Sequence, residues 1–143
     1  MKTTLRFFCI VLVGVVLISC EEILNNPTAA EIASEIEGTW ECDESSSVFK
    51  SATDIYMVYI SPDENDSTLV YISNFYALGN GIEAKARVSG YTLSLFNQTL
   101  TGGYIVQGTG TISTNLKSIS WNYSVDDGSG IKDDVVAKYT YRY

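Results

Sequence analysis

Three cysteines and seventeen carboxylates are the residues most able to do chemistry in this chain, because the sequence contains no histidine. Without histidine there is no Ser-His or Cys-His nucleophile pair, no histidine general base and no histidine-ligated zinc. The carboxylates are plentiful, but no spacing singles out a general acid and a general base. No nucleophile-elbow, phosphate-binding or dinucleotide-binding motif is present. We therefore expect no enzyme and no cofactor.

Cys20 is the cysteine whose surroundings suggest a chemical role. Lys2 and Arg6 precede an apolar run from Phe7 to Ile18. That run is shorter than the ~20 residues that a membrane-spanning helix needs. A basic start followed by such a run is typical of a secretory signal. A short N-terminal membrane anchor is the alternative.

The segment Leu17-Ile18-Ser19-Cys20 directly follows the apolar run and resembles the lipobox of bacterial lipoproteins. The resemblance implies a lipoprotein signal peptide over residues 1–19, a lipidated Cys20 carrying palmitate-type chains, and a tether over residues 20–26. Two or more acyl chains anchor a protein stably, whereas one chain binds a membrane only marginally. The implied location is the bacterial outer membrane, and the sequence leaves open whether the protein faces the periplasm or the cell surface.

Cys42 is the thiol that remains once Cys9 leaves with the signal and Cys20 carries lipid. It falls on the expected inward side of a strand. No histidine is present to activate it, and the neighbouring Asp43 and Glu44 disfavour a thiolate. We interpret Cys42 as a buried structural residue.

Two acidic turns offer oxygen atoms of the kind that calcium binds. They are Asp126-Asp127-Gly128 and Asp133-Asp134, which flank one expected hairpin loop. Their spacing is not that of an EF-hand loop, and charged turns are usually solvated. We expect no metal here.

The elements that hold these residues are one short helix and about eight strands. Asn26-Pro27 predicts a helix start, with asparagine at the N-cap and proline at the first helical position. Ile32, Ala33 and Ile36 then share one face before Gly38. Beyond Gly38, apolar and polar residues alternate with the period of a half-buried strand. The alternating runs are Trp40–Cys42, Ile82–Val88, Tyr91–Leu95, Ile119–Val125 and Val135–Tyr141.

Three further stretches are expected strands with less regular patterns. Asp54–Ile60 and Thr68–Ile72 are apolar on both faces, and Tyr104–Ile112 holds Gly108 and Gly110, which predict a bend or bulge. Short turns join nearly all the runs, and short connections make neighbouring strands antiparallel. We therefore predict an all-β domain over residues 27–143, an up-and-down antiparallel barrel. A two-sheet sandwich is the alternative.

Aromatic side chains dominate the expected inner face of this barrel, in a chain with ten tyrosines. Candidate ligand-binding residues are Tyr91, Tyr104, Trp121, Tyr123, Tyr139 and Tyr141. Such rings suit a pocket in which phenols orient a guest, or they simply fill a narrow barrel. The small inward residues Ala84, Ala86, Gly108 and Gly110 fit either interpretation, because they leave a cavity or make room for the rings.

The order of several short motifs is similar to that of lipocalins. Gly38-Thr39-Trp40 matches the G-x-W that opens their first strand, and a short helix precedes it. Small lipocalin-like lipoproteins of gut Gram-negative bacteria are closer still, with a later G-x-G strand (here Gly108-Thr109-Gly110) and a D-D-G turn. The resemblance implies a calycin-type barrel of up-and-down strands. It also implies that Gly38 and Trp40 close one end.

These observations favour a membrane-anchored binding protein for a small apolar or amphipathic ligand. A net charge of −8 argues against a nucleic-acid partner. The same charge repels an anionic guest. Such a guest would also find no inward basic residue, because Lys85, Arg87, Lys138 and Arg142 fall on the polar face. The alternative is a solid barrel that meets an envelope protein or a glycan. Asp66-Ser67-Thr68 additionally resembles an O-glycosylation acceptor of related bacteria.

Overall fold

The structure is a computed structural model that describes residues 26–48 and 54–143. The expected signal peptide, Cys20 and most of the tether lie outside the described residues. In chain order the elements are helix α1 (Ala29–Glu35), strands β1 (Gly38–Ser46), β2 (Asp54–Pro62) and β3 (Leu69–Ser73), the 3-10 turn η1 (Phe75–Ala77), and strands β4 (Glu83–Ser89), β5 (Thr92–Thr99), β6 (Ile105–Ile112), β7 (Ser118–Asp126) and β8 (Lys132–Arg142).

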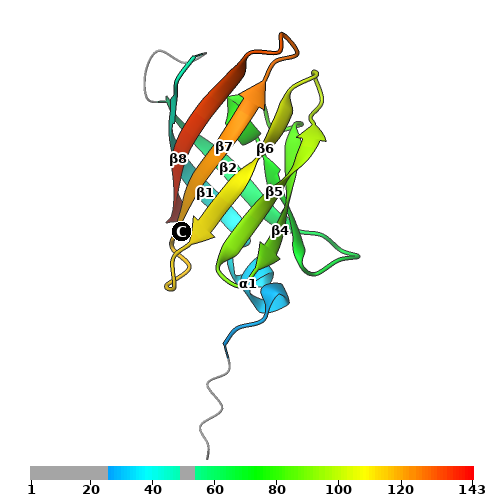
Figure 1. Cartoon of the computed structure of the whole chain (residues 1–143). Helices are drawn as coiled ribbons and strands as arrows, with labels where there is room; N and C mark the ends of the chain where they lie inside the picture. The colour runs from blue at the N-terminus through cyan, green and yellow to red at the C-terminus, as the bar shows by residue number, and fades with distance from the viewer. Residues whose placement is uncertain (1–25, 49–53) are drawn as a thin grey trace, which may run out of the picture.

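The eight strands close into one barrel in the order of the sequence (Figure 1). Each strand pairs antiparallel with the next, and β1 pairs with β8, from Thr39 opposite Arg142 to Ser46 opposite Val135. The predicted all-β, up-and-down barrel is therefore confirmed, and the sandwich is not formed. Closure leaves neither terminal strand as an edge, since the first and last strands satisfy each other's backbone groups.

Helix α1 lies across one end of the barrel (Figure 1). It begins two residues later than predicted, because the N-cap is Thr28 and neither Asn26 nor Pro27 is helical. The hydroxyl of Thr28 accepts from the Glu31 backbone N–H at 3.2 Å, and the Glu31 carboxylate accepts from the Thr28 N–H at 2.7 Å. This reciprocal capping satisfies two backbone donors at once and outweighs the Asn-Pro signal. No helix among the described residues is long and apolar enough to cross a membrane.

The inner face of α1 seals its end of the barrel against Trp40. Ile32, Ala33 and Ile36 are fully buried, as their spacing predicted. The indole N–H of Trp40 donates to the Ile36 carbonyl at 3.0 Å. The Trp40 ring also packs edge-on against Tyr141, with centroids 5.1 Å apart. Trp40 thus lies at the end of the barrel that the helix covers.

The 3-10 turn η1 covers the opposite end, where β3 ends and β4 begins. Phe75 is fully buried and Tyr76 is 5% exposed. The Phe75 ring packs against Tyr123 with centroids 4.8 Å apart and against Trp121 at 6.4 Å. Both ends of the barrel are therefore covered, one by a helix and the other by a short aromatic turn.

The irregularity expected around Gly108 and Gly110 lies in the neighbouring strand instead. The register between β5 and β6 shifts between Leu95 and Gln98, so β5 holds the extra residue. A Cβ on Gly110 would lie 2.9 Å from the Trp121 ring, which shows that this glycine makes room for the ring. A Cβ on Gly108 would lie 2.4 Å from the backbone oxygen of Asn122, so β6 runs unusually close to β7 there.

At the bulge in β5, a side chain makes the hydrogen bonds that the strand backbone does not make. The amide of Gln98 accepts from the Lys85 backbone N–H at 2.9 Å and donates to the Lys85 carbonyl at 2.7 Å. These are the two bonds that a strand partner would make at that position. Strand β4 therefore keeps its backbone satisfied beyond the last residue that pairs with β5.

Candidate functional site

A fully buried carboxylate, Glu44, lies inside the barrel among aromatic side chains. The hydroxyl of Tyr56 donates to Glu44 Oε2 at 2.5 Å, and the hydroxyl of Tyr123 donates to the same oxygen. The Cys42 thiol lies 4.0 Å from that oxygen. Tyr139 pairs directly with Cys42 across the β1–β8 ladder. We call Cys42, Glu44, Tyr56, Tyr123 and Tyr139 the interior polar cluster.

Burial keeps the phenols of this cluster protonated. It raises the pKa of Tyr56, Tyr123 and Tyr139 well above the usual range of tyrosine. Repulsion from the negative charge that Glu44 carries when ionised raises these pKa values further. The phenols are therefore neutral hydrogen-bond donors at any physiological pH. A buried ionisable group costs stability relative to an apolar side chain of the same volume, so this arrangement is not what a barrel filled purely for stability would contain.

Two further polar atoms of the interior lack a good partner. Trp121 Nε1 and the Tyr139 hydroxyl are buried, and neither has a hydrogen-bond partner within the described part of the chain that meets normal geometry. The Tyr139 hydroxyl lies near the Cys42 thiol, which is a weak acceptor, and near Glu44. Leaving such a group buried without a bond costs roughly 1–3 kcal/mol. The two rings touch, with centroids 5.8 Å apart.

The η1 end is held in place by a second buried carboxylate, Asp133. Its Oδ2 accepts from the Tyr76 hydroxyl at 2.7 Å. Its Oδ1 accepts from the backbone N–H groups of Ser47 and Val48, each at 2.8 Å. Burial opposes ionisation of Asp133, but bonds from Ser46, Tyr76 and these neighbours outweigh it and bring its pKa to about 2. Asp133 thus ties η1, the end of β1 and the start of β8 together.

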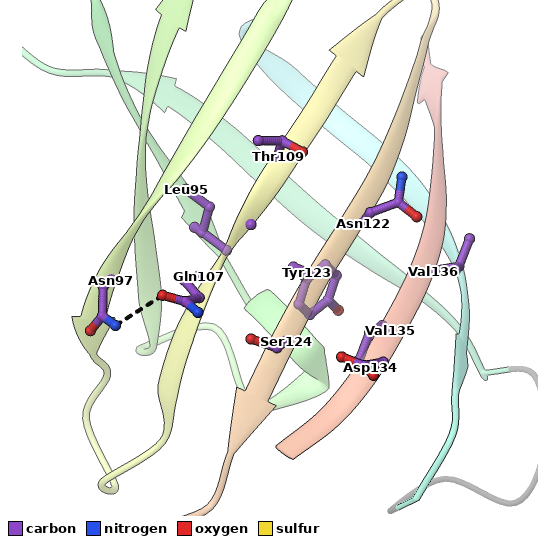
Figure 2. A pocket seen from close by; sticks show the side chains of 11 residues that line it. Leu95, Asn97, Gln107, Thr109, Asn122, Tyr123, Ser124, Asp134, Val135 and Val136 are labelled. Atoms are coloured by element: carbon purple, nitrogen blue, oxygen red, sulfur yellow. Dashed lines mark hydrogen bonds between the residues drawn. The ribbon is translucent and has the colours of Figure 1, made fainter.

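A shallow groove of about 600 Å³ lies on the outer wall of the barrel, over strands β5 to β8 (Figure 2). Strand backbone at Gly108, Tyr123 and Val135 forms its floor. Its polar rim consists of Asn97, Gln107, Thr109, Asn122, Ser124 and Asp134. Asn97 donates to the Gln107 side chain at 2.9 Å, as Figure 2 shows. Apart from Asp134, these rim groups are uncharged amides and hydroxyls.

The six aromatic residues expected to bind a ligand do not form one site. Trp121, Tyr123 and Tyr139 lie together in the middle of the barrel and are buried. Tyr104 is partly buried at the η1 end, with its ring 6.5 Å from that of Tyr76. The remaining two are partly buried at the α1 end, Tyr91 just before β5 and Tyr141 beside Trp40.

The sequence did not predict the two buried carboxylates or the turn η1, which covers the end of the barrel opposite α1. Glu44 continues the inward alternation of Trp40 and Cys42, and this period was the available signal. Asp133 stands at the inward position before Val135 and Ala137, whereas a solvated turn was expected. Phe75 and Tyr76 had no signal, because they follow β3 without alternation.

The remaining candidates are Cys42, the acidic turns and the Asp66-Ser67-Thr68 triplet. Cys42 is buried, as predicted. At the start of the turn between β7 and β8, the Asp126 carboxylate accepts from the backbone N–H groups of Gly128 and Gly130. No group of three or more potential metal ligands occurs within residues 26–48 and 54–143. In the O-glycosylation-like triplet, the Asp66 carboxylate accepts from the Thr68 hydroxyl and forms a salt bridge with Arg87, and Ser67 is exposed.

Comparisons with known proteins add no family to this description. No protein-family model matches the chain. A search of curated proteins found no match either. The functional argument therefore rests on the eight-stranded antiparallel barrel, which is consistent with a calycin-like fold, and on the residues inside and outside its wall.

Proposed function

We propose that this chain is a lipid-anchored, non-enzymatic, lipocalin-like barrel that binds a small amphipathic ligand in its interior. The observation that carries the proposal is the set of polar side chains at the centre of the barrel. Glu44 and three phenols lie among apolar walls, and two buried donors lack good partners. Ligand sites combine apolar walls with a few convergent polar groups in this way.

Titration with neutral probes tests the binding function. Sterol-like, bilin-like and fatty-alcohol probes are added to the protein while tryptophan emission is followed. Because the chain has two tryptophans, the variant Trp40→Phe reports on Trp121 alone, and Trp121→Phe is the matched control. We expect a saturable change in the Trp40→Phe variant and a smaller one in Trp121→Phe. No saturable change with any probe would remove the interior as a ligand site.

The proposed anchor is tested separately. The variant Cys20→Ser should leave the membrane fraction and lose the mass of the acyl chains. Cys9→Ser is the matched control, because Cys9 lies within the proposed signal and should not affect lipidation. Retention of Cys20→Ser in the membrane, or an unmodified N-terminus at another residue, would contradict the lipoprotein proposal. Protease treatment of whole cells distinguishes the periplasmic from the surface leaflet.

A second candidate function is an interaction module that uses the outer groove. Two observations favour it. Both ends of the barrel are covered, and the groove rim offers uncharged amides and hydroxyls, which suit sugar hydroxyls or a peptide backbone. Asn122→Lys places a charge in the groove, and Ser94→Lys places one on the same outer wall outside it. Loss of glycan or envelope-protein binding in the first variant alone would support this function.

A further inference from the structure

The turn that closes the mouth of the barrel is built from strained backbone. Asn74, Tyr76 and Ala77 have φ values of 60°, 57° and 56°, in the left-handed region. Each such residue costs of order 1–3 kcal/mol unless the surroundings hold it there. Only Leu116 joins them among the described non-glycine residues. Asparagine adopts this conformation readily, so the strain lies mainly at Tyr76 and Ala77, at the η1 end of the barrel.

Several contacts hold this turn against the barrel, among them ring contacts of Tyr76 with Tyr104 and Tyr123 and a bond from the Asn74 N–H to the Ile82 carbonyl at 3.0 Å. The Tyr76 hydroxyl bonds to Asp133 at 2.7 Å, and the Asn74 side chain bonds to the Met57 carbonyl at 2.7 Å. The Phe75 ring supplies the apolar contact with Tyr123 and Trp121. The opposite end differs, because there an α-helix with reciprocal capping and a full apolar face is packed on Trp40.

The Phe75 ring therefore occupies space that the wall itself does not fill. It is carried by the turn and not by a strand, and it lies against the ring of Trp121, whose N–H is buried without a partner. Next to Trp121 lies Tyr139, whose buried hydroxyl has no hydrogen-bond partner of normal geometry within the described residues and lies near the Cys42 thiol. The indole N–H is purely a donor, and a phenol donates readily, so both positions call for an acceptor.

The side chains of the interior limit the kind of acceptor. Among the described residues no lysine or arginine is buried, and the Glu44 carboxyl group, which accepts from Tyr123, lies nearby. An anionic group there would lose its hydration without gaining a basic partner. A neutral carbonyl, ether or hydroxyl oxygen satisfies the donors without that cost.

We propose that the Asn74–Ala77 turn is a displaceable plug, and that a neutral hydrophobic molecule with a carbonyl or hydroxyl oxygen replaces the Phe75 ring and accepts hydrogen bonds from Trp121 and Tyr139. This inference rests on the proposed ligand-binding function and adds to it an entrance and a class of ligand. The backbone strain is relieved as the turn lifts, and the ligand accepts hydrogen bonds from donors that have no partner in the closed barrel.

The test uses three probes of similar size that differ in one property each. Acetophenone carries a neutral acceptor, ethylbenzene carries none, and benzoate carries a charge. Titrations are followed by ¹H–¹⁵N spectra of the labelled mature protein, in which the two indole N–H groups give separate signals. Trp40, bonded to Ile36, is an internal control. We expect a saturating shift of the Trp121 signal with acetophenone, a weaker one with ethylbenzene and none with benzoate.

Variants then test the plug. Tyr76→Phe keeps the ring and removes the bond to Asp133, and Phe75→Ala removes the ring. Both should strengthen acetophenone binding, the second by about tenfold or more, because the open state becomes more populated. Ile60→Ala is the matched control, since it opens a cavity of similar kind at the α1 end. The milder Tyr76→Phe keeps the test valid if Phe75→Ala fails to fold.

The outcomes separate this inference from the proposed function. If Ile60→Ala strengthens binding as much as Phe75→Ala, the effect is that of any new cavity and the plug is wrong. If ethylbenzene binds as well as acetophenone, the acceptor requirement is wrong, but interior binding stands. If neither these probes nor the larger neutral probes reach Trp121 in the wild type or in either plug variant, both the inference and the proposed function fall.

Discussion

A methyl group added at Gly110 should destabilise the barrel, whereas the same change at Gly81 should not. A Cβ on Gly110 meets three atoms of the Trp121 ring at 2.9–3.0 Å, and that ring is fully buried. Overpacking of this kind costs typically 1–3 kcal/mol. Against it stands the usual gain of roughly 0.5–1 kcal/mol when alanine replaces glycine inside a strand. We therefore expect Gly110→Ala to lose about 1–2 kcal/mol of unfolding free energy.

Gly81 is the matched position, because a Cβ there meets nothing within 4 Å and its φ is not in the left-handed region. Gly81→Ala should gain about 0.4–1 kcal/mol through the unfolded state. Gly108→Ala should lose more than Gly110→Ala, because its Cβ would meet backbone of β7 at 2.4–2.5 Å and backbone moves less readily than a side chain.

Urea unfolding followed by far-UV circular dichroism measures all three variants at constant slope. The order of stability should be Gly81→Ala, wild type, Gly110→Ala and Gly108→Ala. A double variant with Trp121→Leu should remove most of the cost of Gly110→Ala, since the clash is with that ring. If Gly110→Ala is as stable as Gly81→Ala, the Trp121 ring does not lie over β6 and the inner register is wrong.

Three other variants probe separate parts of the fold. Asp133→Asn should remove roughly 1–2 kcal/mol of stability that is present above about pH 4, because the pKa of Asp133 is depressed to about 2 in the fold. The unfolding free energy of the wild type, measured with urea, should therefore fall between about pH 4 and pH 2. The same dependence of unfolding free energy on pH in both proteins would contradict this. Trp40→Ala should cost about 3–5 kcal/mol by thermal or urea unfolding, because it empties the α1 end, and a cost below about 1 kcal/mol would show that Trp40 is not packed there. Gln98→Ala should speed amide hydrogen exchange at Lys85 and leave Val88, bonded to Thr68, unchanged; unaltered exchange at Lys85 would show that the amide does not replace a strand partner.

The barrel and its aromatic centre were predictable because both follow from local rules. Short turns force antiparallel neighbours, and alternation places Trp121, Tyr123 and Tyr139 inside. The helix start was two residues off because Thr28 with Glu31 offers two backbone bonds, whereas Asn26-Pro27 offers a conformational preference alone.

The parts that escaped prediction depend on contacts between distant residues. Glu44 is buried because Tyr123, on a strand far along the chain, supplies a hydroxyl to it. Charged residues are almost never fully buried without such partners, so the composition of β1 alone argued against it. Tyr76 takes a left-handed conformation that its own side chain disfavours, and Asp133, 57 residues later, is what holds it there.

The pairing of β1 with β8 has a consequence for how the chain reaches this fold. The strands that close the barrel come from opposite ends of the sequence, with Thr39 opposite Arg142. Such a pairing requires the entropy loss of closing a long loop before its hydrogen bonds and contacts form. Folding is therefore expected in the slower range of milliseconds to seconds. Until the last strand docks, β1 and β7 both present bare edges that can pair with another chain. Loss of a few C-terminal residues should therefore favour association between chains far more than its effect on buried area suggests.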